Sequence, residues 1–320
     1  MTIVAGIDEA GYGPTLGPLV LGASAFRLGD GVKERDLDRL VKLRRDQGGL
    51  AIRDSKQLYH SGGSIAAIES TTLGHVVLSR GVLPLRLGAL LTGAVDHDEA
   101  ELRRLPWYGQ ELLDLALPRR AEVTELLERT ERQRELLDDR GLSCAGLFLQ
   151  VIPEPRFNRL TAAAGSKAWT LFYAAGRLIE KLVASFPDEE LVIHLDRHGG
   201  RLHYADMLQT FFPLAPLTTL HERRAESAYV LDWPGRSKVR IDFKVKADDS
   251  RTPVALASVA AKTARELFME RFNAWFAARK PGLAPTAGYP VDARRFLADI
   301  DDLSGELPAD RRQSLLIRCR

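Results

Sequence analysis

Short apolar runs and amphipathic stretches alternate along the chain and divide it into expected strands and helices. Residues Thr2–Ile7 and Pro18–Phe26 are apolar, and each run has the length of a buried strand. The glycine-dense stretch Ala10–Gly17 between them predicts that the two strands form a hairpin. The charged segment Lys33–Arg45 that follows is expected to be helical.

The second half of the chain alternates strands with helices. Residues Ala162–Phe186 carry apolar positions at helical spacing, and Glu190–Leu195 has the character of a buried strand. A further strand is expected over Ser237–Val245 and a further helix over Pro253–Ala278. Strands that alternate with long helices indicate an α/β domain, and the N-terminal hairpin makes its sheet mixed rather than all parallel. The expected fold is a mixed central sheet flanked by helices.

A stretch of different character interrupts this pattern between Gly74 and Pro155. Its segment Glu111–Arg140 is rich in Glu, Arg and Leu, with leucines at helical spacing, and predicts a mostly helical insertion. The expected organisation is a core domain of residues 1–73 and 156–300, a helical insertion over 74–155, and a C-terminal tail or helix over 301–320.

Composition and charge narrow the function classes only slightly. The chain has 320 residues, 45% hydrophobic and 28% charged, as is ordinary for a folded protein. Its net charge of +2 does not by itself indicate a nucleic-acid partner, because a basic surface would have to be local. Cys144 and Cys319 lack the spacing of a zinc site or a disulfide framework. The N-terminus lacks the pattern of a signal peptide, and no apolar run approaches about 18 residues, so a cytoplasmic protein without a membrane span is expected.

Acidic residues recur where the expected strands end. Asp8-Glu9 follows the first strand, Asp196 a later one, and Asp248-Asp249 a third. Strand ends gather at one edge of an α/β sheet, where carboxylates would repel one another unless cations neutralised them. Hard divalent ions with oxygen ligands, Mg²⁺ or Mn²⁺, suit such a set, and two of them can promote hydrolysis of a phosphodiester. The alternative is that each acid is an ordinary loop carboxylate.

The glycine-rich stretch after the first acids suggests a close approach to a ligand. Residues Gly11-Tyr12-Gly13-Pro14-Thr15-Leu16-Gly17 have GxGxxxG spacing with an interrupting proline, which excludes a dinucleotide fingerprint. Free backbone N–H groups here could instead face the hydroxyl or phosphate oxygens of a sugar-phosphate strand. A plain tight turn is the alternative.

Five short motifs occur in order along the chain. They are Gly6-Ile7-Asp8-Glu9-Ala10-Gly11-Tyr12-Gly13-Pro14, Asp54-Ser55-Lys56-Gln57-Leu58, Leu195-Asp196, the block from Lys246-Ala247-Asp248 to Ala257-Ser258-Val259-Ala260-Ala261-Lys262, and Gly288-Tyr289-Pro290. Together they resemble the GxDEAGRGP, DSKxL, third-acid, KxD…ASxxAK and GY(P/G)T elements of ribonuclease HII, a type 2 ribonuclease H. The motifs span roughly half of the chain.

The resemblance implies a ribonuclease H-like fold, with residues 1–73 and 156–300 as the catalytic domain, and a metal-dependent endoribonuclease. The implied catalytic and metal-binding residues are Asp8, Glu9, Asp196 and Asp248, holding two Mg²⁺ or Mn²⁺ ions. The implied substrate is an RNA/DNA hybrid or duplex DNA that contains ribonucleotides, cut to 3′-hydroxyl and 5′-phosphate ends. Neither an obligate protein partner nor a membrane is implied.

The resemblance also implies residues that contact the substrate. Gly11 and Gly13 would read the 2′-hydroxyl through their backbone N–H groups, since that hydroxyl distinguishes RNA from DNA. Tyr289 would stack near the sugar at the RNA–DNA junction. The motifs place Tyr12, Ser55, Lys56 and Lys262 on the substrate side as well, the lysines near phosphates or the acidic cluster.

Several positions depart from the ribonuclease HII pattern. Tyr12 stands where the family has Arg, and Glu266 where it has Asp. Asp249 offers an alternative register for the fourth acid, although the spacing to the end lysine favours Asp248. His198 follows the third acid where the family has Gly-Asn, and Val291 replaces a threonine. The hydrolytic residues are therefore expected to be intact and the substrate-selecting residues altered.

Other features have both a functional and a structural interpretation. His198 could shuttle protons near the metals or be a loop histidine. Trp107 and Tyr108 could stack on bases, but aromatic packing within a helical subdomain is favoured. A basic rim for phosphates could come from Arg197, Arg201, Arg223, Arg224 and Arg236.

Two rival functions remain open at this stage. One is a nuclease of the same fold that acts on another structured nucleic acid, which Tyr12 and the insertion would favour. The other is a non-catalytic nucleic-acid-binding module. Retention of all four acids argues against the second rival, because a buried acidic cluster is destabilising without a cation.

Overall fold

The structure is a computed structural model of the whole chain. It describes residues 1–40, 49–53, 55–59, 64–109, 111–236, 238–306 and 316–319. Within these residues no helix is both long and apolar enough to cross a lipid bilayer.

One mixed sheet of seven strands organises the described part of the chain, in the order β3-β2-β1-β4-β7-β6-β5. β1 runs parallel to β4, and β4 runs parallel to β7, whereas the other neighbouring pairs are antiparallel. The strands are β1 Thr2–Ala10, β2 Leu19–Leu28, β3 Leu142–Ile152, β4 Glu190–Asp196, β5 Leu217–Glu222, β6 Glu226–Leu231 and β7 Val239–Lys244.

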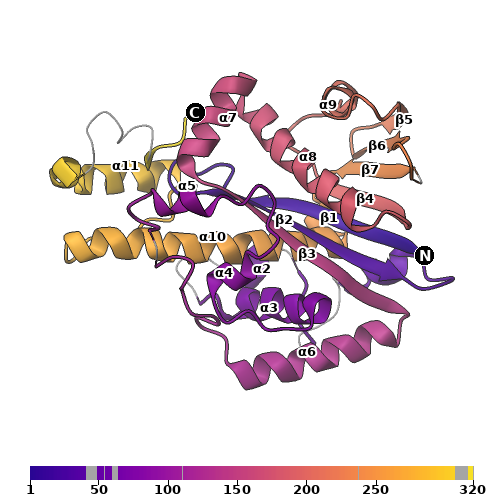
Figure 1. The fold of residues 1–320 in the computed structure, drawn as a ribbon, viewed down its shortest axis with the longest axis horizontal. Helices are drawn as coiled ribbons and strands as arrows, with labels where there is room; N and C mark the ends of the chain where they lie inside the picture. The colour runs from indigo at the N-terminus through magenta and orange to yellow at the C-terminus, as the bar shows by residue number, and fades with distance from the viewer. Residues whose placement is uncertain are drawn as a thin grey trace.

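Helices cover both faces of the sheet (Figure 1), with α7, α8 and α9 on one face and α3, α6 and α10 on the other. The helices are α1 Glu34–Asp38, α2 Ser55–Leu58, α3 Ala66–Arg80, α4 Leu87–Leu90, α5 Glu99–Arg103, α6 Val123–Asp138, α7 Glu154–Ala164, α8 Lys167–Ser185, α9 Ala205–Phe211, α10 Thr252–Arg279 and α11 Pro290–Asp299, with 3₁₀ turns η3 Ala247–Asp249 and η4 Asp301–Glu306. This arrangement confirms the expected mixed sheet flanked by helices.

The long helix α10 lies directly against β1 and β2. A Cβ atom on Gly6 of β1 would lie 2.2 Å from the Val254 backbone nitrogen, and one on Gly22 of β2 would lie 2.3 Å from the Ala257 carbonyl oxygen. Either contact would force the backbones apart. The two glycines therefore set how closely the helix approaches the sheet, and this spacing brings the α10 side chains to the end of β1.

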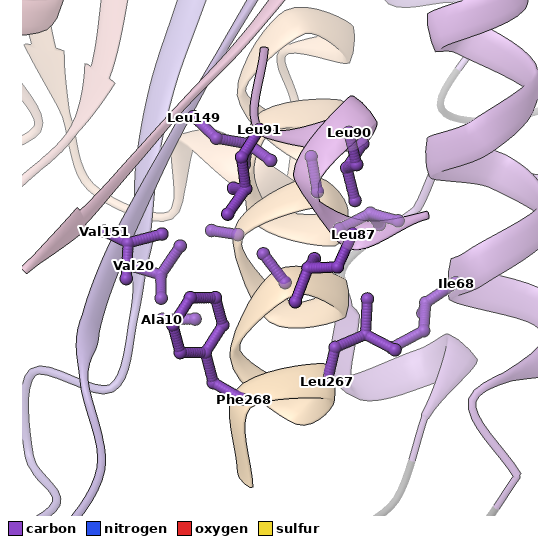
Figure 2. Close-up of a cluster of buried hydrophobic side chains, with 14 of the residues drawn as sticks. Ala10, Val20, Ile68, Leu87, Leu90, Leu91, Leu149, Val151, Leu267 and Phe268 are labelled. Atoms are coloured by element: carbon purple, nitrogen blue, oxygen red, sulfur yellow. The ribbon is translucent and has the colours of Figure 1, made fainter. Parts of the chain in front are cut away.

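A continuous apolar core fills the α10 side of the sheet (Figure 2). Val20 and Val151 from the strands face Leu267 and Phe268 of α10, and residues of α3 and α4 close the cluster. Trp107 and Tyr108 belong to the same core: the Trp107 ring stacks on Phe276, and the Tyr108 ring meets Phe268 edge-on. This confirms the packing interpretation for Trp107 and Tyr108, which have no exposed ring face to offer to bases.

The expected helical insertion over residues 74–155 is wrong in part. Near its end, Leu142–Ile152 forms β3, which pairs antiparallel with β2 and belongs to the central sheet. α3 begins at Ala66, before the expected boundary, and packs on the same core. The helices α4, α5 and α6 do lie in this range, but the strand β3 follows them. Their buried residues belong to the same core as the rest of the domain. The leucines of residues 111–140 have strong helical spacing, and this pattern conceals the strand that follows them in the sequence.

Three other expectations are corrected. β1 extends to Ala10, so Asp8 and Glu9 lie within the strand and not beyond it. The expected helix Ala162–Phe186 is divided between α7 and α8 by Gly165, whose φ is 71°. α1 covers only part of the segment Lys33–Arg45, of which residues 41–45 lie outside the described residues.

Candidate active site

A pocket of about 530 Å³ opens where β1, β4 and β7 end. All four acids singled out in the sequence line it, together with the glycine-rich stretch. Its walls are Asp8, Glu9, Ala10, Gly11, Tyr12, Gly13, Pro14, Ser55, Tyr59, Asp196, Asp248, Ser258, Lys262 and Tyr289. The chain thus brings to one pocket residues that are more than two hundred positions apart in sequence.

Strand register explains how the acids meet. In the parallel pair β1–β4, Ile7 lies beside Leu195, so the next residues, Asp8 of β1 and Asp196 at the end of β4, lie at the same edge of the sheet. β7 lies on the other side of β4 and is followed by η3, which carries Asp248. Parallel strands deliver the residues at their carboxyl ends to one edge of a sheet, and here that edge is acidic.

A tight turn fixes the position of Asp248 relative to Asp196. Lys246 adopts a left-handed conformation with φ of 52°, which folds the chain back directly after β7. The next residue, Ala247, donates its backbone N–H to Asp196 Oδ1 over 2.8 Å. Asp248 then lines the pocket, while Asp249 is exposed and outside it, which favours Asp248 as the fourth acid.

Burial and the neighbouring acids raise the pKa values of Asp8 and Glu9. Burial raises the pKa of Asp8 well above its usual value, the Glu9 charge raises it further, and a hydrogen bond from Ser258 opposes the rise. Burial followed by the Asp196 charge raises the pKa of Glu9 to about 7. Crowded, desolvated carboxylates of this kind favour either protons or cations in the pocket.

The donor set suits a hard divalent cation, because four carboxylates supply only oxygen ligands. Among the described residues, however, no group of three or more His, Cys, Asp or Glu side chains is arranged to hold a metal ion. One oxygen of Asp196 is occupied by the Ala247 N–H. Metal binding at these residues therefore stays a prediction.

Polar residues of α2, α10 and the residue after α2 form another part of the pocket wall. Ser258 lies within 3.2 Å of Ser55 through their hydroxyl oxygens, and it also donates to Asp8. One turn further along α10, Lys262 pairs with Glu266 over 2.8 Å and lies 5.1 Å from the centre of the Tyr59 ring.

Glu266 is a structural partner more than a fifth acid of the pocket. It accepts hydrogen bonds from Tyr59 as well as from Lys262, and it lines a neighbouring pocket. The Lys56 side chain and Asp54 lie outside the described residues, so the predicted role of Lys56 stays a prediction.

The glycine-rich loop has one glycine with a positive φ and one with open space beside it. Gly11 has φ of 89°, and a Cβ there would lie 2.4 Å from Arg265 Nε. Gly13 is exposed and has nothing within 4 Å of its Cβ position. The loop therefore offers backbone to the pocket at Gly13 while Gly11 makes the turn.

Two buried arginines hold the same loop in place through hydrogen bonds to its carbonyl oxygens. Arg265 of α10 donates to the carbonyl oxygens of Leu16 and Ala287, over 3.1 and 3.2 Å. Arg318 donates from its guanidinium to the Pro14 carbonyl oxygen and from its backbone N–H to Thr15 O. A segment at the far end of the chain thus fixes the loop near its start.

Tyr289 completes the pocket from the side of α11. The preceding Gly288 has φ of 84°, and its carbonyl accepts hydrogen bonds from the N–H groups of Thr15 and Leu16. Tyr289 itself is 50% exposed, so its ring is accessible beside the glycine loop. This placement agrees with a stacking role, which the described contacts do not test.

His198 is not placed as a proton shuttle. Its ring packs edge-on against Tyr204 and Phe243 and does not line the pocket. Burial and, second, the positive charge of Arg201 lower the pKa of His198 to about 4, which keeps the ring neutral near pH 7. The structural interpretation of this histidine is the better one.

Sequence reasoning missed several residues of the site and its support. Tyr59 and Ser258 line the pocket, and both occur beside recognised motifs, directly after Leu58 and inside the ASxxAK block. Arg265, Arg318 and Glu154 are buried but carried no local signal, because the proximity of side chains from distant segments leaves no spacing pattern in the sequence.

Comparisons with known proteins were made on both sequence and structure. No family model and no curated protein matches the sequence. The chain is similar to the solved ribonuclease HII of Archaeoglobus fulgidus in its complex with PCNA, at 18% identity and a TM-score of 0.45, covering 99% of this chain and 94% of that one. It is also similar to ribonuclease H2 from Pyrococcus horikoshii, at 16% identity and a TM-score of 0.43, covering 98% and 92%.

A third similar structure is Bst ribonuclease HIII in complex with Mn²⁺, at 14% identity and a TM-score of 0.44, covering 99% of this chain and 66% of that one. At this level of similarity, function has to be argued from the site itself.

Proposed function

We propose that the chain is a metal-dependent endonuclease of the ribonuclease H type that hydrolyses the RNA strand, or single ribonucleotides, in duplexes. The observation that carries the proposal is the shared pocket of Asp8, Glu9, Asp196 and Asp248 beside an open glycine loop. The order of the five sequence motifs supports the same activity.

The carboxylates would hold Mg²⁺ or Mn²⁺ at the edge of the sheet. When bound, two such ions supply an activated water and neutralise charge on the reacting phosphate. Water adds to phosphorus and the bond to the 3′ oxygen breaks, which leaves 3′-hydroxyl and 5′-phosphate ends. Ser258 positions Asp8 by a hydrogen bond, and Asp196 is held by the Ala247 N–H, so two of the four acids have fixed orientations.

The glycine loop would select the ribonucleotide. Gly13 has free space around its Cα, so a sugar can approach its backbone N–H closely. A 2′-hydroxyl that accepts this N–H is absent from DNA, and the backbone of Gly11 and Gly13 offers the contact without any side chain. Tyr12 is half-buried, packs partly against the apolar core and lines the pocket beside the two glycines, so its side chain would lie next to this contact.

The direct test is a cleavage assay with three labelled duplexes that contain one ribonucleotide, a full RNA strand, or DNA only. With Mg²⁺ or Mn²⁺ we expect cutting of ribonucleotide-containing duplexes and no cutting of DNA. Asp8→Asn should lose at least about 100-fold in rate, because a metal-binding carboxylate becomes a weak neutral ligand. Asp249→Asn is the matched control and should retain activity, since Asp249 lies outside the pocket.

Absence of cutting in every ribonucleotide-containing duplex would sink the proposal and favour a non-catalytic binding module. Cutting of DNA at an equal rate would favour a nuclease of broader substrate range.

A further inference from the structure

Beside the acidic pocket lies a group of cations that the proposed chemistry does not use. Three loops at the same edge of the sheet carry them: the loop after β4, the β5–β6 turn and the turn after β7. We call Arg201, Arg223, Arg224 and Lys246 on these loops the basic rim. Arg223, Arg224 and Lys246 are exposed, and Arg201 is partly exposed.

The rim cations are available to a ligand. Among the described residues, none of the four side chains forms an ion pair or a hydrogen bond. The acids that flank the two arginines are engaged elsewhere. Glu222 accepts from Tyr229 and His203, and Glu226 lies 3.4 Å from His221. Within the described residues, the β5–β6 turn therefore presents two arginines that form no ion pair with the acids beside them.

The β5–β6 turn is tied to the acidic pocket by Arg197. This residue directly follows Asp196, and its guanidinium donates to the carbonyl oxygens of Arg224 and Arg223 over 2.7 and 3.0 Å. The Val245 N–H also donates to the Ala225 carbonyl over 3.1 Å, which joins the turn to the end of β7. The guanidinium of Arg197 thus holds the backbone of the β5–β6 turn in place by hydrogen bonds. The side chains of Arg223 and Arg224 extend from this anchored turn.

The rim reaches toward the glycine loop through Arg201. Burial raises the pKa of the Tyr12 hydroxyl, the Glu9 charge adds to the rise, and Arg201 opposes it. Arg201 of the loop after β4 is therefore near enough to Tyr12 for its charge to act on the Tyr12 hydroxyl. Arg236 does not belong to the rim, because it donates to Val183 and Glu189 carbonyls at the opposite edge of the sheet.

We propose that the basic rim, with Arg223 and Arg224 of the β5–β6 turn at its centre, binds the sugar-phosphate backbone of the duplex that flanks the scissile position. This inference rests on the proposed function. Exposed cations on a rigid base suit phosphate contacts, which position a duplex without reading its sequence. They also offset the repulsion between a polyanion and the pocket acids.

The test is the salt dependence of duplex binding, measured by fluorescence anisotropy with a chelator present so that no strand is cut. Each lost phosphate contact lowers the slope of log K against log salt by about 0.9 on duplex DNA, so R223A/R224A should lower it by about 2. Affinity at about 0.1 M salt should fall at least tenfold for DNA-only and ribonucleotide-containing duplexes alike. R223K/R224K should keep the wild-type slope, because a point charge is enough for such a contact.

The matched control is R132A/R134A on α6, which removes the same charge from a helix that Figure 1 shows well away from β5 and β6. It should keep the wild-type slope. An unchanged slope in R223A/R224A overturns the basic rim, and so does a wild-type protein that binds no duplex. Cleavage is measured separately: a chain that binds through the rim and cuts nothing would refute the proposed function alone.

Discussion

At the scale of single residues, Asp8 depends on one hydroxyl group. Burial and the Glu9 charge both favour the protonated acid, and Ser258 is the neighbour that stabilises the ionised form. Ser258 also contacts Ser55, so its hydroxyl is held from two sides. The reactivity of the acid therefore depends on a residue with no chemistry of its own in the proposed reaction.

Ser258→Ala should lower kcat by roughly 10- to 100-fold, since a hydrogen bond to a charged group contributes about 1.5–3 kcal/mol. KM should change less than kcat, because the partners of this hydroxyl are Asp8 and Ser55. The pH at which activity is half-maximal should also move upward as the Asp8 pKa rises. Steady-state kinetics across pH would check this, with Ser55→Ala as the milder control. Wild-type kinetics in Ser258→Ala would exclude the positioning role.

At the scale of elements, the most consequential contact joins the C-terminal segment to the first loop. Arg318 reaches the Pro14 carbonyl, stacks over Phe157 at 4.7 Å, and shares a buried space with Glu154 of α7. Burial raises the pKa of Glu154 to about 7 from its ordinary 4.5. Tyr108 donates to one of its oxygens at 3.4 Å, and within the described residues the other has no hydrogen-bond partner.

This buried acid predicts a pH dependence of stability. Between about pH 4.5 and 7 the folded chain keeps Glu154 protonated while the unfolded chain ionises it, so the folded state binds more protons. Stability should therefore fall as pH rises through this window, by up to about 3 kcal/mol. Urea unfolding at several pH values should show this fall in the wild type and its reduction in Glu154→Gln. Parallel pH profiles for the two proteins would contradict it.

Elements were predictable from sequence where local pattern and tertiary role agreed. The run Thr2–Ile7 and the helix Pro253–Ala278 are predictable from the sequence because most of their apolar residues are buried in the core. β3 was hidden behind the leucine-rich helix α6. The β5–β6 hairpin was not expected either, although residues 217–231 place two short strand-like runs around the polar turn 223–225. That hairpin carries the centre of the basic rim, so the omission affected function as well as fold.

At the scale of the whole molecule, the four acids link cation binding to folding. Asp8 and Glu9 come from β1, Asp196 from the end of β4 and Asp248 from η3, and the three segments meet only in the folded chain. An ion that binds them stabilises the folded state by mass action. The order of the sequence motifs predicted which acids would meet, but not the turn at Lys246 or the braces on the glycine loop, which depend on contacts between distant segments.

Mn²⁺ or Mg²⁺ should therefore raise the melting temperature of the wild-type chain. At about 100 times its dissociation constant an ion adds about 2.7 kcal/mol, a shift of several degrees. The Asp8→Asn/Asp248→Asn variant should melt at a temperature insensitive to these ions, while Asp249→Asn should respond as the wild type does. An equal response in all three proteins would place the ions elsewhere.

Gly6 and Gly22 set the distance between α10 and the sheet. Ser258, Lys262 and Arg265 lie along one face of that helix. The distance between α10 and the strands β1 and β2 therefore determines how far all three side chains extend toward the pocket. A methyl group at Gly6 or Gly22 would lift them together and could disable the pocket with every polar residue in place. Relatives of this chain can therefore be sought by glycine at the positions of Gly6 and Gly22 as well as by the four acids.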